Sequence, residues 1–323
     1  MEKILITGSS GFIGSNLLQL YEDKGYIVSN IDKAQPRREE YSKNWRKINI
    51  LDYDSFESEI LSFKPNIVIH LAARTDLNGK KQADYDSNTI GTQNLIKILN
   101  KVPSVKRVIF TSSMLVCKPG YTPINNTDYA PSTVYGESKV LMEKIIQESK
   151  HSYEWTIVRP TSIWGPWFGE PYRNFFEMII GKKYFHIGKR SCIKTYGYVE
   201  NLMYQIDSIL RAPAEQIQGE VFYLGDYSST NINHWANEIA SELGITVKTI
   251  PYPLIKLAAL GGDVLKLLNI NFPMSSFRLK NMTTNNVINL TNTMEIAPNL
   301  PFSRIDGIKR TLNWLKNYTQ KLV

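Results

Sequence analysis

The stretch Lys3-Ile4-Leu5-Ile6-Thr7-Gly8-Ser9-Ser10-Gly11-Phe12-Ile13-Gly14 decides the fold of this protein. A short apolar run ends in three glycines spaced three residues apart, and Asn16-Leu17-Leu18-Gln19-Leu20, a good helix former, follows. This order predicts a strand, a tight turn and the start of a helix. Because glycine has no Cβ, the backbone N–H groups of such a turn can approach a diphosphate at the helix N-terminus. The G-x-x-G-x-x-G spacing meets the general dinucleotide-binding fingerprint only loosely.

Short runs rich in β-branched residues alternate with amphipathic stretches as far as about residue 160. The expected strands are residues 3–7, 27–31, 47–50, 66–72, 107–112 and 155–159. The expected helix 89–99 carries Ile90, Leu95, Ile96 and Leu99 on one side, and the expected helix 134–148 carries Leu141 and Ile145. This alternation predicts an α/β fold, with a doubly wound parallel sheet that binds ligands beyond the carboxyl ends of its strands.

Candidate cofactor-binding residues follow the ends of these strands. Asp32 lies eighteen residues beyond Gly14, where a carboxylate can accept hydrogen bonds from an adenosine ribose and would repel a 2′-phosphate. This position favours NAD over NADP, although Lys33, Arg37 and Arg38 could relax the choice. After the next two strands, Asn49 and Ile50 can flank an adenine ring, and Leu71, Ala72 and Ala73 let the backbone approach a cofactor.

Two further stretches carry candidate catalytic groups. Thr111-Ser112-Ser113 ends the fifth expected strand, and Tyr135 and Lys139 lie four residues apart, so both face the same side of a helix. A cation beside a phenol favours the phenolate and lowers a pKa that is normally about 10. Such a tyrosine can exchange a proton with a hydroxyl while a serine polarises the same oxygen. The alternative is a surface helix that carries Tyr and Lys by chance. The glycine turn and the strand that ends in hydroxyl residues disfavour this alternative.

These residues together resemble the extended short-chain dehydrogenase/reductase family, in its nucleotide-sugar epimerase/dehydratase branch. The collinear matches are Thr7-Gly8-Ser9-Ser10-Gly11-Phe12-Ile13-Gly14, Asp32, His70-Leu71-Ala72-Ala73, Asn88-Thr89-Ile90-Gly91-Thr92, Thr111-Ser112-Ser113, Tyr135-Gly136-Glu137-Ser138-Lys139 and Arg159-Pro160 with Trp164-Gly165-Pro166. The resemblance implies a Rossmann-type domain over residues 1–165 and about 194–228. A smaller C-terminal α/β domain, over about 166–193 and 229–323, would bind the substrate.

The resemblance also implies roles for single residues. Tyr135 would be the catalytic acid/base, Lys139 would hold the nicotinamide ribose and lower the tyrosine pKa, and Ser113 would bind the reacting oxygen. The implied NAD-binding set is Gly8, Gly11, Phe12, Ile13, Gly14, Asp32, Asn49, Ile50, Leu71, Ala72, Ala73, Asn88, Tyr135 and Lys139.

The implied substrate-binding residues lie mostly in the second half. Lys194 occupies the place of a diphosphate-binding arginine, which keeps the charge but loses the bidentate fork. Arg278 lies near the place expected for a second such arginine, and for both residues an ordinary surface charge is the alternative. Ser162 replaces an asparagine found in many members. The nearby Trp164, Trp167 and Phe168 could either stack on a substrate ring or pack a domain junction.

Composition excludes several classes of protein. The chain has 323 residues, 42% of them hydrophobic, and its net charge of +8 is spread thinly in pairs of basic residues without interleaved aromatics, which disfavours nucleic-acid binding. Two cysteines and four histidines suggest neither a disulfide framework nor a metal site. No leader precedes the first strand, so a cytoplasmic location is expected. The apolar segment 254–268 is too short to span a bilayer and reads as a packed helix.

These observations predict an NAD-dependent epimerase of a nucleotide-activated sugar, with carbon 4 the preferred position. Met114-Leu115 stands where a sugar dehydratase needs an acid and a base, so dehydration is disfavoured. The alternatives are a one-way dehydrogenase or reductase of a keto-sugar or a sterol-like hydroxy compound, which the apolar segment 254–268 keeps open, and a non-catalytic dinucleotide sensor. Family resemblance further implies a homodimer that pairs through the helices at 89–99 and 134–148.

Overall fold

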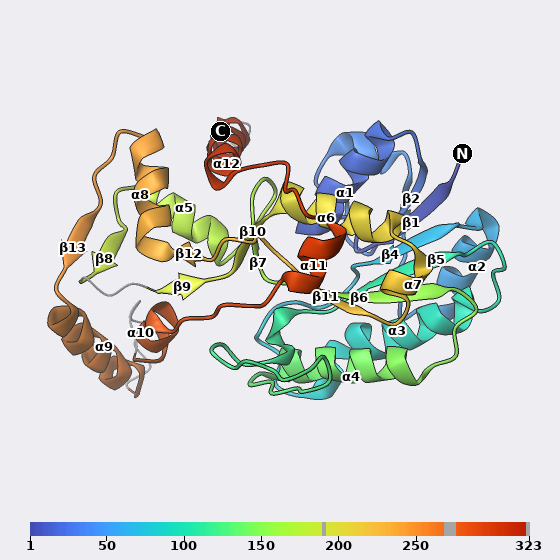
Figure 1. The fold of residues 1–323 in the computed structure, drawn as a ribbon, viewed down its shortest axis with the longest axis horizontal. Coiled ribbons are helices and arrows are strands. Elements are labelled where there is room, and N and C mark those ends of the chain that lie inside the picture. Colours follow the sequence, from blue (N-terminus) through green and yellow to red (C-terminus); the bar gives the residue numbers. More distant parts are fainter. Residues whose placement is uncertain (189–191, 268–275, 321–323) are drawn as a thin grey trace.

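A seven-stranded parallel sheet forms the larger part of the molecule (Figure 1). The computed structural model describes residues 1–188, 192–267 and 276–320. The strand order is β11-β6-β5-β4-β1-β2-β3, and every neighbouring pair is parallel. The strands are β1 Lys3–Thr7, β2 Ile27–Asp32, β3 Trp45–Lys47, β4 Ile67–His70, β5 Arg107–Thr111, β6 Glu154–Pro160 and β11 Val221–Leu224.

Helices cover both faces of this sheet, as predicted. The helices that complete this part are α1 Phe12–Asp23, α2 Tyr53–Phe63, α3 Asp86–Leu99, α4 Val134–Glu148, α6 Val199–Arg211 and α7 Ala214–Ile217, with short 3₁₀ turns at Glu39–Ser42, Gln82–Tyr85 and Met114–Val116. In β1, Ile4 and Ile6 belong to the core beneath α1 and α6, and Leu5 belongs to the core beneath α2, α3 and α4. Side chains alternate along a strand, so a sheet buried on both faces needs apolar residues at every position.

One expected strand is displaced. Residues 47–50 were expected to be extended, but β3 ends at Lys47, which pairs with Asp32 at the end of β2. The Ile48 N–H still donates to the carbonyl of Asp32 at 3.3 Å, but β2 ends at that residue. A few residues later Asp52 accepts a hydrogen bond from the Ser55 N–H and caps α2. The prediction was therefore wrong for Ile48, Asn49 and Ile50 as strand residues.

The apolar faces of α3 and α4 also differ from expectation. In α3, Leu95, Ile96 and Leu99 are buried as predicted, but Ile90 is 44% exposed. In α4, Leu141 is 41% exposed. Ile90 was expected on the same side of its helix as Leu95, Ile96 and Leu99, and Leu141 on the same side as Ile145, but both are exposed.

The remaining elements gather mainly at the other end of the molecule (Figure 1). We call α5, β8, β9, β12, α8, β13, α9 and α10 the smaller lobe. Its elements are α5 Tyr172–Ile180, β8 Phe185–Ile187, β9 Ile193–Lys194, β12 Thr230–Asn231, α8 Ile232–Glu242, β13 Lys248–Ile250, α9 Tyr252–Leu267 and α10 Ser276–Thr283. Between it and the sheet lie β7 Ser162–Trp164, β10 Tyr196–Tyr198, α11 Thr291–Ile296 and α12 Arg304–Gln320.

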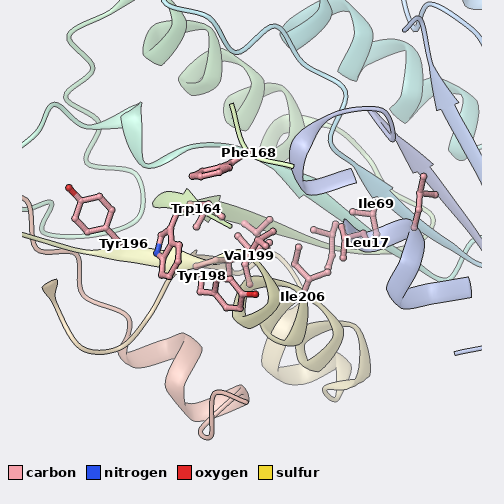
Figure 2. Packing of buried hydrophobic residues seen from close by; sticks show 14 of the residues in the cluster. Leu17, Ile69, Trp164, Phe168, Tyr196, Tyr198, Val199 and Ile206 are labelled. Atoms are coloured by element: carbon pink, nitrogen blue, oxygen red, sulfur yellow. The ribbon is translucent and has the colours of Figure 1, made fainter. Parts of the chain in front are cut away.

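Aromatic packing joins the two parts (Figure 2). Trp164 and Phe168 are 0% and 1% exposed, and the Trp164 ring centroid lies 5.2 Å from that of Trp235. Trp167 packs edge-on against Trp314 with 5.5 Å between ring centroids. These contacts decide the alternative left open by the sequence, because the three side chains of the 164–168 loop pack the junction.

The apolar segment 254–268 is helical but not packed as predicted. It forms most of α9, and Ile255 and Ala259 are buried against the smaller lobe. Leu254, Leu257 and Leu260, by contrast, are each at least half exposed. Within the described residues, no helix combines the length and the apolar character that a membrane span requires.

Candidate active site

A cleft of about 440 Å³ opens beyond the carboxyl ends of the parallel strands. The strand order reverses between β1 and β4, and a doubly wound sheet binds its ligand at such a switch point. The predicted residues that line the cleft are Gly8, Gly11, Phe12, Ile13, Gly14, Asp32, Asn49, Ile50, Leu71, Ala72, Ala73, Ser113, Tyr135 and Lys139. Gly8 and Lys139, which are 131 positions apart in sequence, thus share one cavity.

The glycine turn is as tight as its sequence predicts. Gly8 has a φ of +71°, and a Cβ there would lie 2.6 Å from the Ala72 nitrogen. A Cβ at Gly14 would lie 2.5 Å from the Gly8 carbonyl oxygen. Helix α1 begins at Phe12, and no side chain caps its N-terminus at Gly11. The first N–H groups of α1 therefore face the cleft without a competing acceptor, which suits a diphosphate.

Asp32 ends β2 at the cleft and is held by backbone donors. Its Oδ2 accepts a hydrogen bond from the Ser10 N–H at 3.0 Å, and its Oδ1 accepts one from the Ala34 N–H at 2.9 Å. Each carboxylate oxygen keeps a further lone pair for a ribose hydroxyl. Arg37 donates to the Ser10 and Trp167 carbonyls, so its guanidinium braces the glycine turn against the junction.

Local structure positions the three candidate catalytic residues. Thr133 caps α4 by accepting a hydrogen bond from the Gly136 N–H at 3.0 Å, which fixes Tyr135 in the first turn. Lys139, one turn later, donates to the Thr111 carbonyl at the end of β5 at 2.8 Å. Ser113 directly follows β5 and accepts a hydrogen bond from the Leu115 N–H. Thus β5 and α4 carry the whole set to one wall of the cleft.

Burial sets the protonation of these groups. It raises the pKa of Tyr135 to about 12, although a side-chain hydrogen bond with Ser113 lowers it. Burial also lowers the pKa of Lys139 from 10.5 to about 7, against the attraction of the Glu143 carboxylate. The pKa of Tyr135 is therefore raised, and not lowered as was expected from its lysine neighbour. Burial favours the neutral form of Lys139 as well, which reduces the attraction that a charged lysine would exert on the phenolate.

A buried ion pair holds α4 on the sheet. Arg159 of β6 donates to both carboxylate oxygens of Glu143, and the two side chains are 1% and 0% exposed. Tyr129 donates a further hydrogen bond to Glu143 at 2.9 Å. Because Glu143 follows Lys139 by one turn, this pair also fixes the helix that carries the candidate catalytic residues.

Two hydroxyls in the cleft have no partner within the described part of the chain. Thr111 Oγ1 and Ser112 Oγ are buried and make no hydrogen bond there, and both residues line the cavity. Buried polar groups are rarely left unpaired in a folded protein, so each such group calls for a ligand or solvent partner. Together with the uncapped helix and Asp32, these hydroxyls fit a bound dinucleotide.

Three predicted site residues do not line the cavity, and the side chain of a fourth is not described. Asn88 is fully buried behind the wall, where it donates to Ser138 Oγ and accepts from the Arg74 N–H. Ser162 is buried and accepts a hydrogen bond from the Tyr172 hydroxyl at 2.7 Å. Lys194 lies in β9 of the smaller lobe, away from the cavity lining. Arg278 belongs to α10, but its side chain lies outside the described residues.

Two residues of the cleft that the sequence motifs did not reveal are polar groups contributed from the junction. Glu170 and Tyr172 line the cavity from the junction side, beyond the aromatic loop. Their only sequence signal is their position a few residues after Trp164-Gly165-Pro166. They reach the cleft because Tyr172 opens α5 and is anchored by its hydrogen bond to Ser162.

Comparison with known proteins identifies related chains. The protein is 26% identical over 321 residues to the N-acetyl-alpha-D-glucosaminyl-diphospho-ditrans,octacis-undecaprenol 4-epimerase of Escherichia coli O157:H7, covering 97% of this chain and 95% of that one. It is 28% identical over 272 residues to the UDP-glucose 4-epimerase of Vibrio cholerae, covering 78% of this chain and 79% of that one.

A solved structure has the same fold over nearly the whole chain. The UDP-glucose 4-epimerase of Thermotoga maritima, determined with UDP-glucose, matches with a TM-score of 0.74 at 21% identity, covering 98% of this chain and 99% of that one. The sequence model of the family described as "NAD dependent epimerase/dehydratase family" matches residues 4–225, which include the whole glycine turn and both β5 and α4. The protein therefore belongs to the NAD-dependent epimerase/dehydratase family.

Proposed function

We propose that this protein is an NAD-dependent epimerase that inverts carbon 4 of a nucleotide-activated sugar. The observation that carries the proposal is the meeting of Ser113, Tyr135 and Lys139 in the cleft that the glycine turn closes. The adjacent Met114 and Leu115 also line the cleft. Neither side chain can transfer a proton, which supports epimerisation rather than dehydration. The likeness to two 4-epimerases supports the same reaction.

Each residue has one task in this reaction. Tyr135 exchanges a proton with the sugar hydroxyl, and Ser113 hydrogen-bonds to the same oxygen. Lys139 holds the nicotinamide ribose, and Asp32 holds the adenosine ribose. NAD held by these residues would supply a reversible hydride acceptor, so that the carbon bearing the hydroxyl could be oxidised and then reduced again from its other face. Glu170 and Tyr172 approach the sugar from the junction, and Ser162 orients Tyr172 through their hydrogen bond.

The test is turnover on a panel of UDP-, GDP- and dTDP-sugars, with products identified by NMR and NADH followed by absorbance. We expect the epimer to form without net NADH. Stoichiometric NADH would instead identify a one-way dehydrogenase, and no product from any sugar would refute the proposed substrate class.

Replacing the acid/base residue is the sharpest test of the mechanism. Tyr135→Phe should lower turnover by roughly 10²–10⁴-fold, because it removes the group that carries the proton. Its ring neighbour Tyr85, whose centroid is 5.9 Å away and whose hydroxyl donates to the Asp76 carbonyl, gives the control. Tyr85→Phe should retain turnover within a few-fold, and a Tyr135→Phe enzyme of unchanged rate would contradict the assignment.

A second candidate substrate is a sugar diphosphate carried on a polyprenol instead of a nucleoside. The relative matched over 97% of this chain is named for such a substrate, and that match includes the smaller lobe. A polyprenyl-diphosphate N-acetylhexosamine should therefore join the substrate panel. Conversion of this compound alone would favour the lipid-linked substrate over the nucleotide sugar.

A further inference from the structure

Helix α9 carries a row of apolar side chains on its outer side. Ile255 and Ala259 are 3% and 0% exposed and pack with Leu279 of α10. The opposite side is open to solvent. It displays Leu254 (59% exposed), Leu257 (68%), Leu260 (50%) and Val264 (58%). We call these four residues the α9 face.

The α9 face is continuous and free of charge. At 100° per residue, its four members and Gly261 fall within an arc of about 120°, opposite Ile255 and Ala259. The row from Leu254 to Val264 is about 15 Å long at a rise of 1.5 Å per residue. No charged residue falls within this arc, whereas Lys256 lies beside it and is exposed. Surface helices normally turn charged side chains to solvent, so an exposed apolar row of this size indicates a partner.

Two segments of the sequence, one of which contains this helix, are rich in positive charge, contrary to the even distribution expected from composition. Residues 178–199 contain five Lys or Arg and no Asp or Glu. Residues 243–290 contain five Lys or Arg and a single acidic residue, Asp263. The two segments together carry +9, although the net charge of the whole chain is +8. Lys182 and Lys183 closely precede β8, which pairs with β13, and β13 leads into α9 at the end of the smaller lobe (Figure 1). Lys189 and Arg190 lie outside the described residues.

We propose that the α9 face docks the protein on an anionic lipid bilayer. A helix with an uncharged apolar side and basic flanks can lie in the plane of the interface, with its leucines among the acyl chains. The flanking lysines, among them the exposed Lys248, Lys256 and Lys280, face a negative headgroup layer. Pairing with a second copy through this face is disfavoured, because it would bring together two strongly positive ends.

This surface goes beyond the proposed epimerase reaction, because it lies outside the cleft and shares none of its lining residues. Docking would hold the enzyme at the bilayer by the end of the smaller lobe. Membrane binding and sugar turnover are separate measurements, so either proposal can fail while the other stands.

The first test is co-sedimentation of the full chain with vesicles. We expect at least about tenfold stronger partitioning to phosphatidylcholine vesicles that contain about 30% phosphatidylglycerol than to phosphatidylcholine alone. Raising the salt from about 0.1 M to about 0.5 M should weaken the binding, because it screens the lysines. Protein that stays in the supernatant with both vesicles at the lower salt overturns the proposal.

Variants locate the contact. Leu257→Asp combined with Leu260→Asp should lower the partitioning at least about tenfold, with an unchanged unfolding temperature because both side chains are exposed. Ile124→Asp is the matched control, since Ile124 is 90% exposed and lies outside the smaller lobe. Equal binding by the α9 variant and the control would overturn the proposal. So would a smaller oligomer in the α9 variant alone, because the face would then join two copies.

A dye at the same position gives a direct readout. Cys117 and Cys192 are both buried, so Leu257→Cys offers the accessible thiol in the described chain for an environment-sensitive fluorophore. We expect a blue shift on addition of the anionic vesicles for this variant and none for Ile124→Cys. Identical spectra with and without vesicles would show that the α9 face stays in water.

Discussion

At the scale of the residue, the buried lysine has the most definite consequence. Burial lowers the pKa of Lys139 from 10.5 to about 7, so between these values the unfolded chain binds a proton that the folded chain does not. The lysine therefore destabilises the fold in full below about pH 7, and this cost fades as the pH rises toward 10.5. We expect the stability of Lys139→Met relative to the wild type to be greater at about pH 6 than at about pH 9.

The measurement is the free energy of unfolding by denaturant at each pH. Any constant effect of losing the hydrogen bond to the Thr111 carbonyl cancels in the comparison between pH values. Lys144→Met is the control, because Lys144 is exposed on the same helix and should give a difference that does not vary with pH. A pH-independent difference for Lys139→Met would mean that the lysine keeps its charge in the folded protein.

At the scale of the element, the turn between β1 and α1 combines two constraints that can be separated. Gly8 and Gly25 both have positive φ, +71° and +75°, but a Cβ at Gly8 would strike the Ala72 backbone at 2.6 Å, and one at Gly25 would meet nothing within 4 Å. We expect Gly25→Ala to cost about 1–2 kcal/mol, the penalty of the left-handed conformation alone. Gly8→Ala should cost at least about 3 kcal/mol, because the backbone of Leu71 and Ala72 just after β4 must also move.

Urea unfolding measures both losses, and titration with NAD measures the cofactor site. The Gly8→Ala variant should bind NAD more weakly, whereas Gly25→Ala should bind it as the wild type does, since Gly25 lies outside the cleft lining. Equal losses of stability in the two variants would show that the contact with Ala72 relaxes without cost.

At the scale of the whole molecule, the exposed apolar residues of α3 and α4 support the proposed homodimer. Ile90 and Leu141 are 44% and 41% exposed on two helices that pack against each other. A stable dimer of this size buries about 1,600 Å² in total, within reach of a two-helix face. We expect Ile90→Asp with Leu141→Asp to convert a dimer into a monomer, measured by light scattering after gel filtration.

The α9 face provides the control for this prediction. Leu257→Asp lies on the smaller lobe and should leave the mass unchanged. A wild-type protein that is already monomeric, or an α3/α4 variant that remains dimeric, would contradict pairing through these helices.

The sequence by itself determined the sheet, the turn and most of the cleft. Glycine spacing and the alternation of strand and helix act over short range, and parallel strands deliver their carboxyl ends to one edge. For this reason Gly8, Asp32, Ser113 and Tyr135 could be assigned to one cavity before any coordinates. The bounds of β3 were not predictable in this way. The strand ends at Lys47 because its neighbour β2 ends at the paired residue Asp32, and this pairing is not visible in the sequence.

Only the tertiary structure decided which side chains face a distant element. Apolar periodicity cannot distinguish a face that packs from one that stays open, so α9 was expected to be a packed helix although several of its leucines are exposed. Likewise, Lys194 has a suitable charge but lies away from the cleft lining, whereas Tyr172 reaches the cleft through a loop with no motif of its own. The pKa values of Tyr135 and Lys139 also follow from burial, a property of the folded chain and not of its residue spacing.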